Sequence, residues 1–376
     1  MSPARATIQE GPVMQNSITW VGMDVHAENI VLAAVRGSTD AVLLRAEFPN
    51  TPKGRERLAG RLAENAPVRC VYEAGPCGYE LRRFLEGRGI ECDVAAPALI
   101  PRKPGDRVKT DRKDAEKLAR CHRLGDLATV FVPTPAQEAL RDLLRTREDA
   151  REDLLRRRHR LSKFLLRLGR RYTEGERWTT RHWDWIRAQT FTDHNAETVF
   201  REYIVAIEQE VERIRRIEQQ IVEESKNPEV GKAIARLRAL RGVDTITAMT
   251  IITEVIDLNR FRSPRELMAF IGVVPRERSS GGRERRGSIT KTGNAHIRRV
   301  LIESAWHYQR LPAGTPKTIL ARREGQPPEV IETARKAELR LHRKFMKLLG
   351  RGKPKGIAAV AVARELAGFI WALGRG

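Results

Sequence analysis

The sequence predicts an α/β domain followed by a mainly helical remainder, and three observations carry that prediction. Short β-rich runs alternate with helical segments up to about residue 130. Beyond residue 136, leucine and isoleucine recur three and four residues apart among dense charge. A chain of 376 residues is also long enough for two or three domains with cores. We therefore expect five parts: a disordered leader 1–17, an α/β domain 18–135, a helical coiled-coil segment 136–228, a compact domain 229–314 and a basic helical tail 315–376.

The first domain opens with three closely spaced β-rich runs, which predict an antiparallel meander. They are residues 18–25, 29–36 and 41–48. After these three strands come the first helix, the fourth strand, the second helix, the fifth strand and the third helix. Their ranges are 51–65, 68–73, 79–86, 91–95 and a helix that begins at Asp111. Three strands followed by alternating strands and helices predict a mixed sheet with helices on its faces.

The charge of the chain favours a polyanionic partner. Lys and Arg number 70 against 48 Asp and Glu, which gives a net charge of +22 and a pI near 10.5. Each neutralised phosphate releases condensed counterions, so nucleic acid fits such an excess. A membrane surface is the weaker alternative, because the apolar run 357–373 is interrupted by Arg364 and Glu365.

Other features of composition are consistent with a soluble intracellular protein. The first 17 residues contain no apolar stretch of the kind that directs export. The four cysteines lack the paired short spacings of a zinc site, so we expect reduced thiols packed in or beside the core.

Four carboxylates stand where the predicted layout can bring them together. Asp24 lies in the first strand, Glu73 ends the fourth, and Asp111 and Asp114 open the third helix on one face. If the first and fourth strands are neighbours, these acids converge at one edge of the sheet and suit Mg²⁺ or Mn²⁺. The alternative for Asp111 and Asp114 is simple complementation of the helix dipole, and the helix opening alone favours it. Nearby basic residues would hold a phosphate backbone; they are Arg102, Lys103, Arg107, Lys109 and Lys113.

The middle of the chain predicts two long amphipathic helices joined by residues 172–198. Two interpretations are open: a helical hairpin packed on its own chain, or a coiled coil that makes a homo-oligomer. Between the helices lie Trp178, Trp183 and Trp185. We expect them to form a small core plug rather than a platform for stacking bases.

Residues 237–248 resemble a helix-hairpin-helix, a unit that presents backbone N–H groups to phosphate, although such a turn can also be purely structural. A Ser-Ser-Gly-Gly turn at 279–282 follows, and then a segment 287–294 that leads into a helix over 295–308. Taken alone, the turn is a flexible loop.

The N-terminal motifs resemble a known domain. The predicted order β-β-β-α-β-α-β-α is similar to the RNase H and RuvC superfamily. WVGMDV, VYEAGPCGYEL and DRVKTDRKDAEKLA resemble the three motifs of the RuvC-like domain in transposases with a DEDD acid set. The resemblance implies that Asp24, Glu73, Asp111 and Asp114 are catalytic metal ligands. His26 is a local variation: two residues after Asp24 it could share the face of that strand, although a lone histidine is more often a surface residue.

A second block, FIGVVPRERSSGGRERRGSITKTGNAHIRRVLIESAWHY, resembles the C-terminal domain of the same insertion-sequence recombinases. That resemblance implies a DNA transposase guided by a bridge RNA, with Ser280 as the catalytic nucleophile of a covalent phosphoserine intermediate. Ser280 and the acids would lie in different domains, so we expect a composite site, built between subunits of a dimer or tetramer. Basic residues of this block would contact nucleic acid: Arg276, Arg278, Arg283, Arg285, Arg286, Lys291 and Arg298.

Two other functions fit parts of the sequence. A RuvC-type junction nuclease would hydrolyse DNA with two metals and leave Ser280 incidental. A non-catalytic nucleic-acid scaffold would need neither the acids nor the serine. The complete acid set argues against the scaffold, and the block from Ser279 to Asn294 argues against a plain nuclease.

Overall fold

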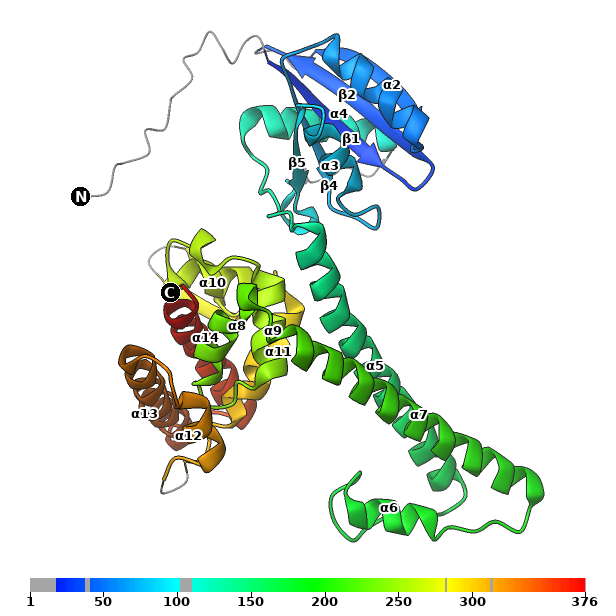
Figure 1. The fold of residues 1–376 in the computed structure, drawn as a ribbon, viewed down its shortest axis with the longest axis vertical. Coiled ribbons are helices and arrows are strands. Elements are labelled where there is room, and N and C mark those ends of the chain that lie inside the picture. Colours follow the sequence, from blue (N-terminus) through cyan, green and yellow to red (C-terminus); the bar gives the residue numbers. More distant parts are fainter. Residues whose placement is uncertain (1–17, 38–40, 102–109, 281–282, 312–313, 376) are drawn as a thin grey trace. The chain divides into compact units, whose positions relative to one another are not determined.

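The computed structural model describes residues 18–37, 41–101, 110–280, 283–311 and 314–375, and within the hairpin it describes only the backbone of 278–280 and 283–286. The chain forms two compact units, Met1–Val132 and Pro133–Gly376. The boundary falls just before the first of the long helices (Figure 1). The four cysteines are free thiols, and burial raises the pKa of Cys70 to about 12.

Unit 1 is built on one five-stranded sheet in the order β3-β2-β1-β4-β5. The strands are β1 (Thr19–Val25), β2 (Asn29–Arg36), β3 (Val42–Pro49), β4 (Val68–Glu73) and β5 (Glu91–Ala95). The first three pair antiparallel, whereas β1–β4 and β4–β5 pair parallel. The expected mixed sheet is therefore confirmed, and the first and fourth strands are neighbours.

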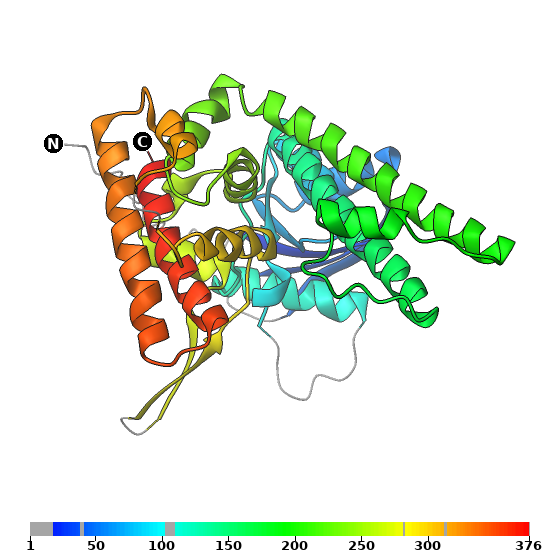
Figure 2. The same ribbon diagram turned by 90° about the horizontal axis from the view of Figure 1, so that it is seen from below.

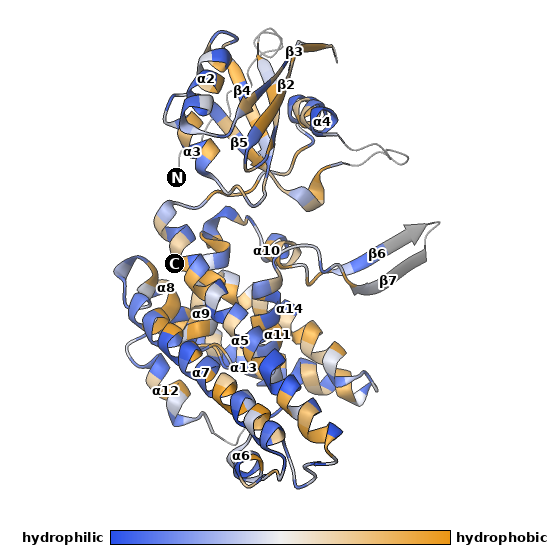
Figure 3. Cartoon of the chain, turned by 90° about the vertical axis from the view of Figure 1, so that its right-hand side faces the viewer, coloured by the Kyte–Doolittle hydropathy of each residue, from blue (hydrophilic) through white to orange (hydrophobic). Residues whose placement is uncertain are grey.

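Helices cover both faces of this sheet. They are α2 (Pro52–Ala63), α3 (Glu80–Glu86) and α4 (Asp111–Leu124). Figure 3 shows α4 on one face and α2 with α3 on the other. Successive strand residues point to opposite faces. Met23 and Tyr72 belong to the core beneath α2 and α3, so Asp24 and Glu73, which follow them, belong to the face that α4 covers.

Gly22 lets α4 lie directly against β1. A Cβ at Gly22 would stand 2.0 Å from the carbonyl oxygen of Ala115 and 2.4 Å from the amide nitrogen of Ala119. Both alanines are fully buried, and their small side chains allow the same close approach. This contact fixes the height of α4 over the strand that carries Asp24.

In unit 2, two long helices form an antiparallel hairpin within the chain. They are α5 (Pro135–Arg167) and α7 (His194–Glu224), with the short α6 (Thr180–Arg187) at the far end of the arm (Figure 1). Ile207 and Ile221 are fully buried along the hairpin. The two helices pack on each other within one chain, as the hairpin interpretation predicts. The tryptophans at the far end pack partly into a small core with Phe164 and Ile186, as expected of a plug. Trp178 and Trp185 are only partly buried there and also line a hollow.

The body of unit 2 is helical and shares one core. Its helices are α8 (Pro228–Arg238), α9 (Thr245–Val255), α10 (Pro264–Ile271), α11 (Ala295–Trp306), α12 (Lys317–Arg323), α13 (Pro328–Gly350) and α14 (Lys355–Gly374). Figure 2 shows α13 and α14 side by side, and α14 also packs on α8, α10 and α11. We expected residues 315–376 to be a tail. The structure corrects this, because the apolar surface of α13 and α14 is buried in the core of the body.

Among the described residues, α14 alone is long and apolar enough to cross a membrane by length and composition. Its apolar side chains are nevertheless used inside the protein, since Ala363, Leu366 and Ala367 are fully buried. It is a core helix of unit 2.

The Ser-Ser-Gly-Gly turn, which taken alone predicts a flexible loop, joins a two-stranded antiparallel sheet, β6 (Pro275–Ser280) with β7 (Arg283–Ile289). Its two serines end β6, and Gly281 and Gly282 lie outside the described residues. These strands are rich in Arg, Glu and Ser and show no apolar alternation, so the sequence carried no signal for a strand. Backbone pairing within the ribbon, which local sequence does not report, determines this structure.

The helix pair at residues 228–255 is present, but its turn faces inward. Leu240 and Val243 are fully buried, and Arg241 is paired with Glu338 of α13 at 3.1 Å. A Cβ at Gly242 would stand 2.6 Å from the carbonyl oxygen of Ser304 in α11. In this structure the turn packs against the core of unit 2. This arrangement fits a structural turn rather than one that presents its backbone N–H groups to phosphate.

Candidate functional site

The structure brings together Asp24, His26 and Asp111 on the α4 face of the unit 1 sheet. His26 Nε2 lies 3.4 Å from Asp24 Oδ2 and 3.7 Å from Asp111 Oδ2. One side-chain ligand atom from each of the three residues lies within 4.8 Å of the others. We call these three residues the acid cluster.

Local sequence explains how Asp111 reaches Asp24. Thr110 caps α4 by accepting a hydrogen bond from the Lys113 amide, so the helix begins at Asp111. Asp111 lies one turn before Ala115 on the helix face that packs on Gly22, and Asp24 lies two residues after Gly22 on the same strand face. The close contact at Gly22 therefore sets the distance between the two carboxylates.

His26 is held by the turn between β1 and β2. The His26 backbone N–H donates to the Asn29 carbonyl at 2.9 Å, and Asn50 Nδ2 donates to the His26 carbonyl at 2.7 Å. Our sequence interpretation favoured a surface residue, and the His26 side chain is 49% exposed, but it also sits on the face of Asp24 that was the alternative. The available signal was its position two residues after Asp24, which places both side chains on one face.

The electrostatics of the cluster are set by burial and by crowded negative charge. Burial raises the pKa of Asp24 above its ordinary value, and the neighbouring charges of Asp111 and Asp114 raise it further, while His26 lowers it. Carboxylate oxygens are the ligands that Mg²⁺ and Mn²⁺ prefer, and a divalent cation would relieve this repulsion. The residues present therefore fit a divalent metal, with Asp24 and Asp111 as the oxygen donors.

The structure places Glu73 and Asp114 near this cluster without including their carboxylates in it. Met23 pairs with Tyr72, so Glu73 ends β4 at the level of Asp24 on the neighbouring strand, with an exposed side chain. The charge of Asp114 acts on Asp24 from the first turn of α4. The sequence thus predicted that Asp24 and Asp111 come together, and it gave the position of His26 on the face of Asp24 only as an alternative.

The predicted nucleic-acid contacts of unit 1 are only partly within the described residues. Lys113 is exposed in the first turn of α4, beside the cluster. The others lie outside the described residues: Arg102, Lys103, Arg107 and Lys109.

Ser280 is the last residue of β6, and its backbone partner across the hairpin is Arg283. The side chains of Ser280, Arg278, Arg283, Arg285 and Arg286 lie outside what the structure describes.

At the base of the hairpin, Arg276 is exposed and Nη2 donates to the Thr290 carbonyl at 3.4 Å. Lys291 has a positive φ of 57°, a conformation that costs a non-glycine residue energy. Arg298 Nη1 donates to the Ile271 carbonyl at 2.8 Å, so this guanidinium also closes the end of α10.

Two family models match this chain. One is a DEDD transposase model that matches residues 21–169, which include the acid cluster. The other is described as the transposase IS116/IS110/IS902 family and matches residues 234–318, which include the β6–β7 hairpin.

Curated relatives extend over nearly the whole chain. A putative transposase, y4qE, of Sinorhizobium fredii is 42% identical over 95% of this chain and 88% of its own length. The transposase for insertion sequence element IS1533 of Leptospira borgpetersenii is 34% identical over 89% of this chain and 97% of its own. The transposase for insertion sequence element IS1111A of Coxiella burnetii is 27% identical over 62% of this chain and 64% of its own. The chain therefore belongs to the IS110/IS116/IS902 family of insertion-sequence transposases, enzymes that bind, cut and rejoin DNA, and it carries the DEDD nuclease-like domain of that family.

Proposed function

We propose that this transposase cuts and rejoins DNA through a covalent phosphoserine intermediate on Ser280, assisted by a divalent metal at the acid cluster and guided by a bridge RNA. The observation that carries the metal part is the grouping of Asp24, His26 and Asp111 within 4.8 Å. The serine part is supported by the position of Ser280 at the end of β6, inside the matched range 234–318.

In the proposed reaction, Ser280 Oγ attacks a phosphorus atom of the DNA backbone and gives up its proton. The bond between phosphorus and the leaving DNA oxygen breaks, and that oxygen takes up a proton. The DNA end is then joined to the protein by a phosphate ester, and attack by a different DNA hydroxyl reverses the step and frees Ser280. No external energy source is needed, because one phosphodiester is exchanged for another.

The acid cluster would hold Mg²⁺ or Mn²⁺ with Asp24 and Asp111, with Glu73 and Asp114 completing the acid set. When bound, such an ion supplies positive charge to a phosphate at the site. The residues of the chain contribute orientation: the turn fixes His26, and the packing of α4 on Gly22 holds Asp111 beside Asp24.

The proposed partners are the DNA ends of the element, a target DNA, a guide RNA and further copies of the chain. Exposed Val205 and Val211 on α7 favour self-association through the arm, because the hairpin leaves them uncovered. Val211→Asp should then lower the mass measured by light scattering; an unchanged mass would exclude the arm as the interface.

A trapping experiment tests the reaction. A DNA substrate with a nick near the cleavage position should leave protein joined to DNA, because the short fragment diffuses away before rejoining. Ser280→Ala should lose both the adduct and cleavage, whereas Ser288→Ala, a serine in β7 of the same hairpin, should keep both. Cleavage that persists in Ser280→Ala would overturn the proposal.

A second candidate is a metal-dependent nuclease that hydrolyses DNA without a serine. It is favoured by one observation, that the acid cluster lies wholly within unit 1. Hydrolysis leaves free DNA ends and no adduct, so the same experiment distinguishes the two.

A further inference from the structure

The far end of the helical arm contains a hollow that neither the acid cluster nor the hairpin accounts for. It has a volume of about 150 Å³ and is lined by the end of α5, the following loop and α6. Part of its lining comes from residues 170–186, which lie between the ranges 21–169 and 234–318 of the two family models. The hollow is smaller than the roughly 300–1,000 Å³ of sites for drug-sized ligands, so it suits one planar ring rather than a larger molecule.

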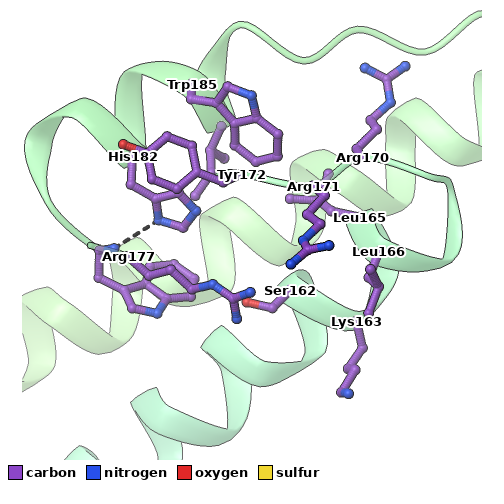
Figure 4. Close-up of a pocket in the computed structure, with 12 residues that line it drawn as sticks. Ser162, Lys163, Leu165, Leu166, Arg170, Arg171, Tyr172, Arg177, His182 and Trp185 are labelled. Atoms are coloured by element: carbon purple, nitrogen blue, oxygen red, sulfur yellow. Dashed lines mark hydrogen bonds between the residues drawn. The ribbon is translucent and has the colours of Figure 1, made fainter. Parts of the chain in front are cut away.

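One wall of the hollow is aromatic and fixed. The His182 ring stacks on Trp185 with centroids 5.8 Å apart and 10° between planes, and Tyr172 packs on His182 at 4.6 Å (Figure 4). His182 Nδ1 accepts a hydrogen bond from the Trp178 amide at 2.8 Å, so the neutral ring carries its proton on Nε2. Trp178 has a positive φ of 67° that this bond helps to hold. The rings are therefore placed before any ligand arrives.

The rim of the hollow is cationic. Lys163, Arg171 and Arg177 line it and are exposed, and in the described part of the chain none of them has an ion pair or a hydrogen-bond partner. Figure 4 shows the guanidinium groups of Arg171 and Arg177 beside Ser162. Most other arginines of this region are paired; Arg181, for example, bonds Glu174 at 2.8 Å. Three unpaired cations thus lie together at the rim of the hollow.

The segment around the hollow is also strongly basic. Residues 156–187 hold eleven Lys or Arg against three Asp or Glu, a net +8 out of the chain's +22. Such a concentration in under a tenth of the chain creates a local positive field that attracts polyanions.

We propose that this hollow binds one unpaired nucleotide of a single-stranded nucleic acid, with the base against the aromatic wall and its phosphates at Arg171 and Arg177. Aromatic side chains beside a basic groove bind single strands of DNA or RNA in this way, because every base has a face that stacks. A duplex is disfavoured, because its bases are already stacked on each other. The inference does not rest on the phosphoserine reaction, since it uses none of the residues proposed for cleavage.

Binding of short fluorescent oligonucleotides to the full-length protein tests this site. The probes are 12-nucleotide single strands of DNA and of RNA, the same strands with one abasic position, and a duplex. The double variant Arg171→Gln/Arg177→Gln should bind both single strands more weakly and reduce the slope of log affinity against log salt by about 1.4, at ~0.7 per lost phosphate contact. Comparison of the affinities for the RNA and the DNA strand shows which nucleic acid is the natural ligand: the one that binds more tightly.

A matched control is Arg181→Gln/Arg187→Gln, which removes the same charge from α6 outside the hollow, where both residues are paired with glutamates. Its salt slope should equal that of the unmodified protein. Loss of the base should weaken binding to the unmodified protein by roughly 5- to 150-fold when the abasic position occupies the site. Trp185→Leu keeps the apolar packing and should remove this difference between intact and abasic strands.

Several outcomes would overturn the site. One is an equal slope for the two double variants, and another is equal affinity for duplex and single strand. A third is photocrosslinking of a 5-iodouracil strand only to peptides outside residues 162–186. Displacement of the oligonucleotide by an acidic peptide at equal charge concentration would assign the hollow to a protein partner instead.

Discussion

Asp24 and Asp111 differ in their surroundings although they share one site. Asp24 is half-buried beneath α4, whereas the side chain of Asp111 is 53% exposed at the start of that helix. The fold places Asp24 in partial burial and beside other carboxylates, and both effects raise its pKa. A half-buried carboxylate that faces other carboxylates is typical of a site that works with a cation.

Asp24→Asn or Asp111→Asn should lower DNA cleavage by about a thousandfold, because a metal-held phosphate gains several kcal/mol from the ion. Affinity for DNA should change little, since basic side chains supply most of it. Cleavage and gel-shift assays at several Mn²⁺ concentrations measure both quantities. Asp126→Asn, at the opposite end of α4, is the matched control and should cleave normally. Normal cleavage by Asp24→Asn would remove the metal site from the reaction.

At the same scale, the sequence located Asp24 and Asp111 because their strand and helix are strongly patterned. It favoured a surface residue for His26, whose side chain is indeed 49% exposed, but it could not show that the hydrogen bonds to Asn29 and Asn50 fix this turn beside Asp24. The role of Ser280 rests on its sequence block alone, because the structure describes only its backbone.

At the scale of elements, small residues determine how closely helix and sheet approach. The sequence predicted every strand of unit 1 and the helices on its faces, because apolar runs and turn residues alternate clearly. It could not predict the height of α4 over β1, which depends on Gly22 meeting Ala115 and Ala119 across the core. It also missed the β6–β7 ribbon, whose residues have no apolar pattern.

Gly22→Ala should destabilise unit 1 by about 1–3 kcal/mol, because the added Cβ meets the backbone of α4 and neither side can yield easily. The shift of α4 should also reduce cleavage by moving Asp111 away from Asp24. Denaturant unfolding and the cleavage assay measure the two effects. Gly60→Ala in α2 is the control: its Cβ meets nothing within 4 Å, so it should stabilise by about 0.5–1 kcal/mol. Equal stability of the two variants would contradict the close packing of α4.

Glu254 of α9 joins three helices of unit 2. It accepts hydrogen bonds from Arg145 of α5 at 2.8 and 3.0 Å and from Asn294, the cap of α11, at 2.6 Å. Burial alone would raise the pKa of Glu254, but the hydrogen bonds and charge of Arg145 outweigh it and hold the pKa below 4.5. The ionised form is thus favoured in the folded state.

Because the folded pKa is depressed, the stabilisation from Glu254 is complete above about pH 4.5 and is lost as the pH falls through the folded value. Arg145→Ala should cost about 3 kcal/mol at pH 7, the low end for a buried pair because Arg145 is itself 41% exposed. That cost should shrink below pH 4.5, and calorimetric unfolding at several pH values measures it. The control is Glu332→Gln, in an exposed pair with Lys336, which should leave the melting temperature nearly unchanged. A cost independent of pH would contradict the ionised pair.

At the scale of the whole molecule, unit 2 holds +19 of the net charge of +22 and unit 1 only +3, and the charge is especially dense at the end of the arm. The sequence predicted this affinity for polyanions. It could not predict that α13 and α14 complete the core of unit 2. An apolar helix has the same sequence pattern in a tail and in a core, because the pattern does not identify the helices that it packs against.

Protein produced together with its whole insertion element should retain a discrete RNA after purification, because the proposed guide is bound through many phosphates. The complex should weaken steeply as salt rises. Sequencing of the bound RNA identifies it, and protein produced from the coding segment alone is the control. Recovery of heterogeneous host RNA in both preparations would contradict guidance.

The most direct measurement is the position of the phosphate on protein trapped with a nicked DNA substrate. After nuclease and protease digestion, mass spectrometry should find the nucleotide remnant on the peptide of the β6–β7 hairpin, with fragment ions that place it on Ser280. The adduct should be absent in Asp24→Asn, because serine alone is a weak nucleophile at neutral pH. A remnant on Ser279 or Ser288, or cleaved DNA ends with no protein attached, would contradict the account.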